Sequence, residues 1–409
     1  MKILLINKYW RIAGGVEVHA FEVARWLAAR GHEVIPFAMR EKDTLPNNEI
    51  DNFPPEVDFR GGSLGPALKG LIRATISLDS RDSLRDLIKR EQPDAAYVLH
   101  VYHQLGMGLI NELKRHGVPV VLSLHDYKIA CPNYRLFSEK TNRICTKCLD
   151  RRMGFLIAPV REKCWGGGVA SGAALTIEAI STKVQRSYKL ADVVTVLNSL
   201  QRTAVLRAGV PESRIMSVPH AVPLSHGTQK RPDNGARFLY VGRLVPEKGV
   251  DVLIRAAAKS RSSITIAGDG RSRNELQRLA RELSVDAIFL GQVDRKRIEQ
   301  LMRESRALIV PSIWHEVSPL VVYEAIRQDL PVVASEVGGM VDQLGGSRGY
   351  LVRPGAVGDL ADTLRAIILD PEEARTRSLR ARQHAATAWS LKAWERNMVG
   401  AFSVAGVSV

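Results

Sequence analysis

Residues 311–325 read PSIWHEVSPLVVYEA and follow a short apolar run of the length of a buried strand. Ser318 is a residue type that caps helix starts, and Pro319 suits the first helical position, so a helix is predicted to begin here. The free N–H groups of a helix start bind anions such as phosphate. Glu316 precedes this start and Glu324 lies one to two turns inside, where a carboxylate can accept hydrogen bonds from ribose hydroxyls. The segment indicates a phosphate-binding unit, although an ordinary capped helix with a surface glutamate has the same pattern.

Short apolar runs alternate with amphipathic stretches on both sides of this segment, a pattern typical of parallel sheets covered by helices on both faces. In the second half, strands are predicted at 237–241, 263–267, 287–290, 307–310 and 331–334, and helices near 250–258, 273–283 and 320–327. In the first half, strands are predicted at 3–6, 33–37, 95–99, 120–124 and 193–197, and a helix at 16–30. The fold class is therefore α/β, with two doubly wound Rossmann-like domains facing each other across a cleft.

The length of 409 residues also fits two domains, each with its own core. A polar stretch without periodicity marks the linker between them. The predicted division is a first domain over 1–224, a linker over 225–235, a second domain over 236–380, and a C-terminal helix over 381–409 that contains Trp389 and Trp394 and packs back on the first domain.

The composition is that of a globular protein, with 45% hydrophobic and 25% charged residues. No apolar run approaches the roughly 20 residues that span a bilayer, and the short run at 1–6 reads as a buried strand instead of a signal peptide. The net charge of +15 favours an anionic partner, although scattered surface cations also explain it. We expect a cytoplasmic protein that contacts the anionic inner face of a membrane peripherally.

Two cations follow the first predicted strand of the second domain. Arg243 offers a bidentate fork and Lys248 a point charge, and both suit a diphosphate leaving group without help from a metal ion. The turn Gly268-Asp269-Gly270 follows the next strand and lets backbone approach a planar base. Taken singly, these features are also those of surface residues and a plain turn.

Together, these motifs resemble the retaining glycosyltransferases of family GT4, which have the GT-B fold. The resemblance covers nearly the whole chain and rests on the order of Gly14-Gly15, His125-Asp126, Arg243 with Lys248, Gly268-Asp269-Gly270, and Glu316 with Glu324. Its most specific part is the pair of glutamates downstream of the two cations.

The resemblance implies a role for each matching residue. The implied catalytic residues are His125, which contacts a donor-sugar hydroxyl, Glu316, which binds the transferred sugar, and Arg243 and Lys248, which bind the diphosphate. The implied donor-binding residues are Gly14 and Gly15 under the diphosphate, Gly268, Asp269 and Val293 around the base, Ser318, Leu320 and Val321 at the phosphate, and Glu324 at the ribose. Many family members have Gly where this chain has Ser318-Pro319, and because Pro319 has no N–H, the amides of Leu320 and Val321 take over the phosphate.

The activity that the resemblance implies is transfer of a sugar from a nucleoside diphosphate sugar to a hydroxyl of a glycan or lipid-linked acceptor. The anomeric configuration is retained by front-face attack, and the leaving phosphate assists deprotonation of the acceptor. Our preferred pathway is synthesis of a bacterial surface polysaccharide or glycoconjugate. Alternatives are a nucleotide-sugar epimerase of the same shape and a zinc-containing nucleic-acid-binding protein. We expect no nucleic acid partner, because the sequence lacks the basic helix that such zinc modules place in a groove.

All four cysteines fall in one window, predicted as an insertion over residues 131–164 of the first domain that overhangs the cleft. They are Cys131, Cys145, Cys148 and Cys164, with the middle pair as Cys-x-x-Cys. Four thiolates complete a closed tetrahedron, so the pattern indicates structural zinc without a catalytic role. An iron–sulfur cluster and unligated thiols remain alternatives. We therefore place the chain in a GT4-like subgroup with a four-cysteine insertion.

Overall fold

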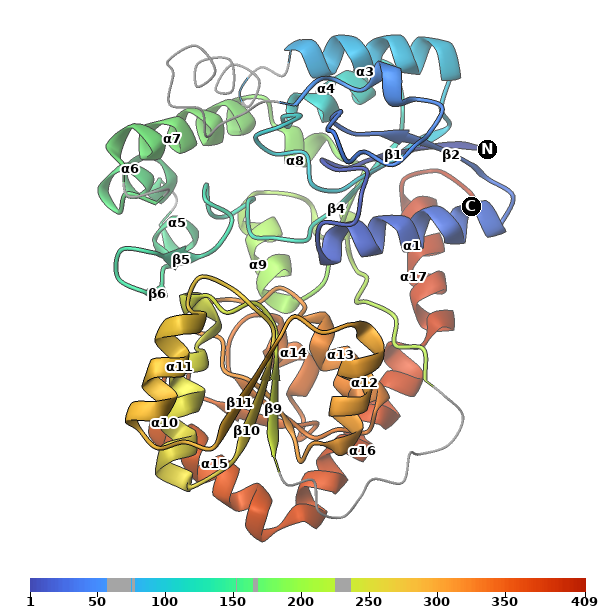
Figure 1. The fold of residues 1–409 in the computed structure, drawn as a ribbon. Coiled ribbons are helices and arrows are strands. Elements are labelled where there is room, and N and C mark those ends of the chain that lie inside the picture. The colour runs from blue at the N-terminus through green and yellow to red at the C-terminus, as the bar shows by residue number, and fades with distance from the viewer. Residues whose placement is uncertain (57–74, 76–77, 152, 165–167, 225–236) are drawn as a thin grey trace.

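The computed structural model describes residues 1–56, 75, 78–151, 153–164, 168–224 and 237–409, and the predicted linker lies outside them. Figure 1 shows two α/β domains, one above the other, with the N-terminal domain at the top. Each domain contains a parallel sheet of six described strands with helices packed around it. The predicted α/β class of two doubly wound domains is confirmed.

The first sheet has the strand order β2-β1-β3-β4-β7-β8, and all of its pairs are parallel. Its strands are β1 (Lys2–Ile6), β2 (Glu33–Phe37), β3 (Ala95–Val98), β4 (Val120–Ser123), β7 (Val193–Val196) and β8 (Ile215–Ser217). The helices of this sheet are α1 (Gly15–Ala29), α3 (Leu78–Glu91), α4 (Gly108–Arg115), α8 (Ser187–Leu190) and α9 (Ser199–Arg207), with short 3-10 turns at Ile50–Asn52 and Glu212–Arg214.

The second sheet has the order β11-β10-β9-β12-β13-β14 and is also parallel. Its strands are β9 (Phe238–Val241), β10 (Ile264–Ala267), β11 (Ala287–Gly291), β12 (Leu308–Val310), β13 (Val332–Ser335) and β14 (Tyr350–Val352). Its helices are α10 (Val250–Ser260), α11 (Arg273–Glu282), α12 (Arg295–Glu304), α13 (Leu320–Arg327), α14 (Gly339–Leu344), α15 (Val357–Leu369) and α16 (Pro371–Ala388), with a 3-10 turn at Pro246–Lys248.

The predicted strands and helices match these elements to within two residues at each end. This agreement follows from burial, because most of the predicted strands are short apolar runs that are largely buried, as in β3, β4 and β7. The edge strand β11 is an exception, since only Gly291 is buried in it. The two edge strands β8 and β14 were not predicted. Each is only three residues long and partly exposed, which is too short for an apolar run that marks a buried strand.

The strand order fixes where ligands can bind. In the first sheet the direction of succession reverses between β1 and β3, and in the second it reverses between β9 and β12. Loops at the carboxyl ends of the strands diverge at such a switch point and leave a crevice. The loop after β9 carries Arg243 and Lys248, the loop after β12 carries Glu316, and the loop after β1 carries Gly14 and Gly15.

The cysteine-containing segment departs from the doubly wound pattern. It forms the hairpin β5 (Phe137–Ser138) and β6 (Arg143–Ile144), then helices α5 (Lys147–Asp150), α6 (Gly154–Arg161) and α7 (Val169–Val184). Figure 1 shows this segment at the left edge of the first domain, where β5, β6 and α5 approach the second domain.

The predicted C-terminal helix is two helices in the structure. Helix α16 ends at Ala388, and α17 (Leu391–Val404) begins after Ser390, whose side chain accepts a hydrogen bond from the Ala393 amide. Trp394 lies in the core of the first domain, as the sequence predicted, whereas Trp389 lies in the core of the second, which corrects its predicted position. Within the described residues, no helix combines the length and apolarity needed to cross a bilayer.

Candidate functional site

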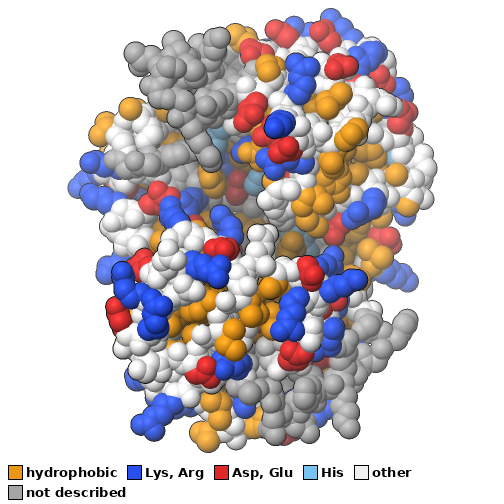
Figure 2. Space-filling view, in the orientation of Figure 1, with side chains coloured by type: hydrophobic (Ala, Val, Ile, Leu, Met, Phe, Trp, Pro, Cys, Tyr) orange, Lys and Arg blue, Asp and Glu red, His pale blue; other side chains and the backbone are white. Residues whose placement is uncertain are grey.

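The residues at the two switch points meet between the domains. Figure 2 shows a hollow between the upper and lower halves, with histidine and charged side chains inside it. Tyr127 of the first domain donates a hydrogen bond of 3.2 Å to the backbone oxygen of Glu316, and Asn198 donates one of 2.7 Å to that of Val317. The first domain therefore holds the loop that follows β12 directly.

Glu316 is the most strongly held carboxylate of this hollow. Its Oε1 accepts hydrogen bonds from Lys248 Nζ at 2.6 Å, Ser312 Oγ at 2.7 Å and Trp314 Nε1 at 2.8 Å. The residue is buried, which alone would raise its pKa, but the charge of Lys248 and the three hydrogen bonds lower the pKa below its ordinary value. The carboxylate is therefore ionised at neutral pH. In the described part of the chain no hydrogen bond reaches Oε2, which is left able to accept sugar hydroxyls.

The predicted cap at Ser318 is wrong. Helix α13 begins at Leu320, Pro319 occupies the N-cap position with an extended backbone, and no side chain caps the helix. The Ser318 hydroxyl instead donates a 3.1 Å hydrogen bond to the Tyr323 hydroxyl. The first free amides of the helix are therefore those of Leu320 and Val321, the two that the sequence assigned to phosphate.

Glu324 lies on helix α13, and its carboxylate has different surroundings from that of Glu316. Burial raises the pKa of its carboxyl, and the cations Arg295 and Arg327 oppose that shift. Among the described residues, no hydrogen bond to its carboxylate is found. A half-buried carboxylate with no protein donor is suited to accept two hydrogen bonds from a ligand.

The two predicted cations lie near each other in the loop after β9. Lys248 pairs with Glu316 and also lies 5.5 Å from the centre of the Trp314 ring. Arg243 is within electrostatic range of Tyr134, because its charge lowers the pKa of that phenol against the larger effect of burial. Since Tyr134 belongs to the cysteine-containing segment, that segment faces the cations.

Arg135 connects the same segment to the second domain, whereas the sequence suggested only that it could meet an anionic acceptor. Its guanidinium pairs with the buried carboxylate of Glu247 and lies 5.5 Å from the centre of the Trp314 ring. Both side chains of the ion pair are mostly buried, at 16% and 6% exposure. Ser312 and Trp314 were missed, and so was the pairing of Arg135 with Glu247. The first two could have been found as donors four and two residues before Glu316, whereas no sequence signal pairs Arg135 with Glu247.

Glycines allow the backbone to approach closely at this site. A Cβ on Gly268 would lie 1.9 Å from the oxygen of Gly242, so the turn at 268–270 packs directly on the loop that carries Arg243. Asp269 closes this turn by accepting the Gly270 amide at 2.7 Å, and Val293 follows the neighbouring strand β11. These positions agree with a surface for a planar base.

The predicted Gly14-Gly15 pair lies at the domain interface. Gly14 is the N-cap of α1, and a Cβ on Gly15 would come within 3.3 Å of the Leu320 side chain. The start of α1 in the first domain thus lies against the start of α13 in the second.

Four histidines surround the floor of the hollow. The ring centre of His19 lies 4.7 Å from that of His125 and 5.3 Å from that of His220. The ring centres of His100 and His125 lie 6.2 Å apart. Burial lowers the pKa of His220 to about 4, and burial together with the neighbouring imidazoles holds the pKa of His19 and His125 well below its usual range. His19, His125 and His220 are therefore neutral at pH 7, so His125 can accept or donate a hydrogen bond without carrying charge.

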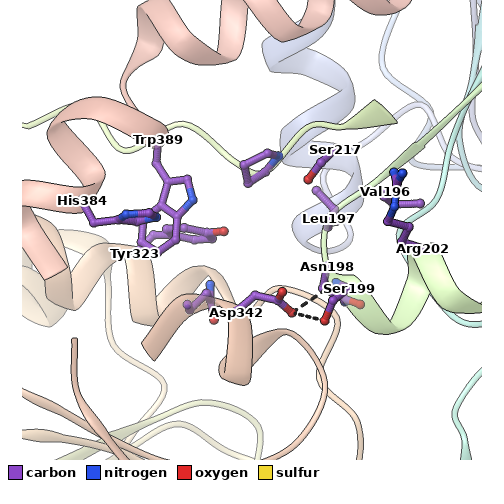
Figure 3. Close-up of a pocket in the computed structure, with 12 residues that line it drawn as sticks. Val196, Leu197, Asn198, Ser199, Arg202, Ser217, Tyr323, Asp342, His384 and Trp389 are labelled. Carbon is purple, nitrogen blue, oxygen red and sulfur yellow. Dashed lines mark hydrogen bonds between the residues drawn. The ribbon is translucent and has the colours of Figure 1, made fainter. Parts of the chain in front are cut away.

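A cavity of about 280 Å³ lies beside this cluster, between the domains (Figure 3). Tyr323, His384 and Trp389 line one side of it, and Asn198 and Ser199 line another. The amide and the hydroxyl of Ser199 donate to Asp342 Oδ2 at 3.2 and 3.0 Å across the domain boundary. None of the predicted cations or glutamates lines this cavity, so it lies next to the candidate site and is not part of it.

The four cysteines share one region, as the sequence predicted for their window. Burial and the charges of the other three cysteines raise the pKa of Cys148, and burial with the charges of Cys131 and Cys145 raises that of Cys164 to about 12. The thiols therefore lie within electrostatic range of one another. Within the described ranges, however, no group of three or more Cys, His, Asp or Glu side chains is arranged to hold a metal ion. The donor set suits zinc chemically, whereas the side chains do not form a site.

Two family models match the chain, one on each domain. "Glycosyltransferase Family 4" matches residues 13–159, and "Glycosyl transferases group 1" matches residues 224–384. Together they cover most of the sequence and include the loops that carry Gly14, His125, Arg243 and Glu316.

Curated relatives align over almost the full chain. Glycogen synthase of Mycobacterium tuberculosis is 27% identical, with 94% of this chain and 90% of the relative covered. D-inositol 3-phosphate glycosyltransferase of Kribbella flavida is 28% identical, with 93% and 89% covered.

Solved structures share the fold. Sucrose-phosphate synthase from Thermosynechococcus elongatus superimposes with a TM-score of 0.71 at 19% identity, over 98% of both chains. The lipopolysaccharide outer core galactosyltransferase WaaB has a TM-score of 0.67 at 18% identity, over 98% of this chain and 99% of WaaB. Anabaena HepE, in a complex with UDP, has a TM-score of 0.67 at 18% identity, over 98% of this chain and all of HepE.

Two doubly wound domains with paired glutamates and cations between them define a glycosyltransferase of the GT-B fold that takes a nucleotide-sugar donor. The chain belongs to the family 4, group 1 glycosyltransferases, which retain the anomeric configuration.

Proposed function

We propose that this glycosyltransferase moves a hexose from a uridine diphosphate sugar to a hydroxyl of a glycan or lipid-linked acceptor in synthesis of a bacterial surface polysaccharide or glycoconjugate. The uridine nucleotide is suggested by HepE, whose structure contains UDP, and the acceptor class by WaaB, a lipopolysaccharide galactosyltransferase. We place the reaction at the inner face of a membrane in the cytoplasm.

The observation that carries the proposal is the arrangement at Glu316. Its Oε1 is held by Lys248, Ser312 and Trp314, so the carboxylate cannot rotate away. Oε2 then has a fixed direction and its share of the carboxylate charge, which suits hydrogen bonds to the hydroxyls of the transferred sugar. Lys248 pairs with this carboxylate from the loop that also carries Arg243, where a diphosphate would gain a positive partner.

The chemistry requires no protein nucleophile. Arg243 and Lys248 stabilise the negative charge that develops on the departing diphosphate, and the amides at the start of α13 add further donors. The diphosphate oxygen that loses the sugar accepts the proton of the acceptor hydroxyl on the same face. The neutral His125 contributes a hydrogen bond to the donor sugar, and domain closure keeps water out.

The test is a screen of nucleoside diphosphate sugars for nucleotide release, run with and without soluble glycan acceptors. We expect release with one uridine diphosphate hexose, accelerated by acceptor. Interconversion of free donor without nucleotide release would identify an epimerase instead, and neither binding nor release with any donor would reject a transferase.

For the cysteines we propose structural zinc in the segment next to the site. The support is the Cys₄ donor set and the shared region of the thiols, which zinc would bind as thiolates and draw together around one position. Elemental analysis of purified protein should find one zinc per chain and four thiols protected from alkylation. Iron with visible absorbance would indicate a cluster, and a folded chain with reactive thiols and no metal would exclude both.

A further inference from the structure

Helices α6 and α7 expose an unusual amount of apolar side chain. Gly172 of α7 packs against Pro159 of α6 so closely that a Cβ there would lie 2.4 Å from the Pro159 oxygen. The two helices therefore form one rigid unit. Six large apolar side chains of this unit, Met153, Ile157, Val169, Ile177, Ile180 and Val184, are 39% to 75% exposed.

The exposure on α7 follows one face of the helix. Val169, Ile177, Ile180 and Val184 are spaced by multiples of three or four residues, so they form one stripe. The opposite face is also used, because Gly172, Leu175 and Glu178 are buried against the domain. A helix that is apolar on its outer face as well as its inner one is suited to a second apolar environment.

The surroundings of this stripe are basic. Exposed cations at the ends of the two helices and just beyond them are Arg151, Arg161, Lys163, Lys183, Arg186 and Lys189. The nearby carboxylates are largely neutralised, since Glu162 pairs with Lys147 and Glu178 is buried in a pair with Lys128. At the left edge of Figure 2, hydrophobic and basic side chains lie next to each other.

We propose that the α6–α7 unit is a docking surface for an anionic lipid bilayer, with its apolar stripe in the headgroup region and its cations against lipid phosphates. Apolar side chains with a basic border are the features that hold a helix in a membrane interface, and anionic lipid supplies the complementary charge. A second copy of the chain fits less well, because two such basic surfaces would repel each other.

The α6–α7 unit lies where docking would bring the candidate site close to the membrane. Helices α6 and α7 belong to the cysteine-containing segment, whose Arg135 pairs with Glu247, so the lipid surface would lie beside the first-domain side of the hollow. The inference rests on the membrane location in the proposed function but not on the identity of the donor or acceptor, so vesicle binding and nucleotide release can fail separately.

The experiment is co-sedimentation of the full chain with vesicles of phosphatidylcholine alone and of phosphatidylcholine with phosphatidylglycerol. We expect binding to the anionic vesicles only, weakened by high salt. The triple variant Ile177→Ser, Ile180→Ser, Val184→Ser should bind about tenfold more weakly, because it withdraws apolar area from lipid. Arg161→Glu with Lys163→Glu should abolish the preference for anionic lipid.

Leu369→Ser is the matched control, because Leu369 is an equally apolar side chain that is 84% exposed on α15 of the second domain. This substitution should leave vesicle binding unchanged. Nucleotide release with a soluble acceptor should be equal in all of these variants. The proposal is overturned by wild-type protein that ignores anionic vesicles or by a triple variant that binds them normally. It is equally overturned by a wild-type dimer that the triple variant converts to a monomer.

Discussion

Replacing Glu316 by Gln should reduce the rate of sugar transfer far more than it weakens nucleotide binding. The substitution keeps an oxygen for Ser312 or Trp314 but removes the charge that pairs with Lys248 at 2.6 Å. It also removes the charged acceptor that we assign to the sugar hydroxyls. The side chains of Glu316 and Lys248 are only 8% and 19% exposed, so solvent screens little of this loss.

The size of the effect follows from the hydrogen bonds involved. A hydrogen bond to a charged group contributes about 1.5–3 kcal/mol, and about 1.4 kcal/mol corresponds to tenfold in rate. We therefore expect kcat to fall by about 10- to 100-fold, while the Kd for the free nucleoside diphosphate changes by less than about threefold. The first is measured by nucleotide release with saturating donor, the second by titration calorimetry.

A stability control accompanies these measurements, because the unpaired Lys248 could also perturb the loop. The Tm of the Glu316→Gln variant should stay high enough for both assays to be run on folded protein. A loss of nucleotide affinity as large as the loss of kcat, or an unchanged kcat, would refute the assignment of Glu316 to the sugar.

Four further outcomes are expected. Glu324→Gln should weaken nucleotide binding about tenfold with a smaller effect on kcat at saturation, because it removes a charged acceptor from the ribose; calorimetry that shows unchanged affinity would contradict this. In a double-mutant cycle with Arg135→Ala and Glu247→Ala, urea unfolding should give a coupling of about 1–3 kcal/mol, as for a mostly buried pair, and a coupling near zero would mean that the contact is incidental. Burial lowers the pKa of His220 to about 4 from 6.5, so its contribution to stability is complete above pH 6.5 and is lost as the pH falls toward 4, by up to about 3 kcal/mol. Urea midpoints should fall over that window, and less so in His220→Asn. Gly338→Ala should destabilise the protein by about 2 kcal/mol or more and abolish transfer, because the φ of Gly338 is +52° and a Cβ there would lie 2.1 Å from the backbone oxygen of Glu316. A stable, active variant would contradict the geometry.

The sequence predicted the strands and the candidate site where local pattern and burial coincide. The apolar runs that became β1, β4 and β9 are short, continuous and almost completely buried, so they contain their own signal. Arg243, Lys248 and Glu316 were selected because each follows a predicted strand, and Glu324 because it lies inside the helix predicted at 320–327.

Two kinds of feature were beyond the sequence. One is the choice between competing local arrangements: Ser318 is a good cap by type, but its hydroxyl bonds to Tyr323, and Pro319 takes the cap position. The other is contact between distant segments. Nothing local indicates that Arg135 meets Glu247, or that Trp389 joins the core of the second domain.

The strand order of the first sheet was also not predictable. In the described residues its edge is β2, whereas the second sheet has the additional strand β11 at the matching edge. Both orders satisfy the same right-handed parallel connections, so hydrophobic patterning cannot distinguish them.

Helix α17 constrains the order in which the protein can be made. Trp394, Met398 and Phe402 belong to the core of the first domain. The ring centres of Trp394 and Trp26 lie 5.5 Å apart, and those of Phe402 and Tyr97 lie 6.1 Å apart. A ribosome makes these residues after the whole of β9 to α16. The first domain therefore emerges from translation with part of its interior missing, and must wait, open to chaperones or proteases, until the second domain has been synthesised. For the same reason, a gene cut between the two domains would yield a first half with an uncovered apolar surface.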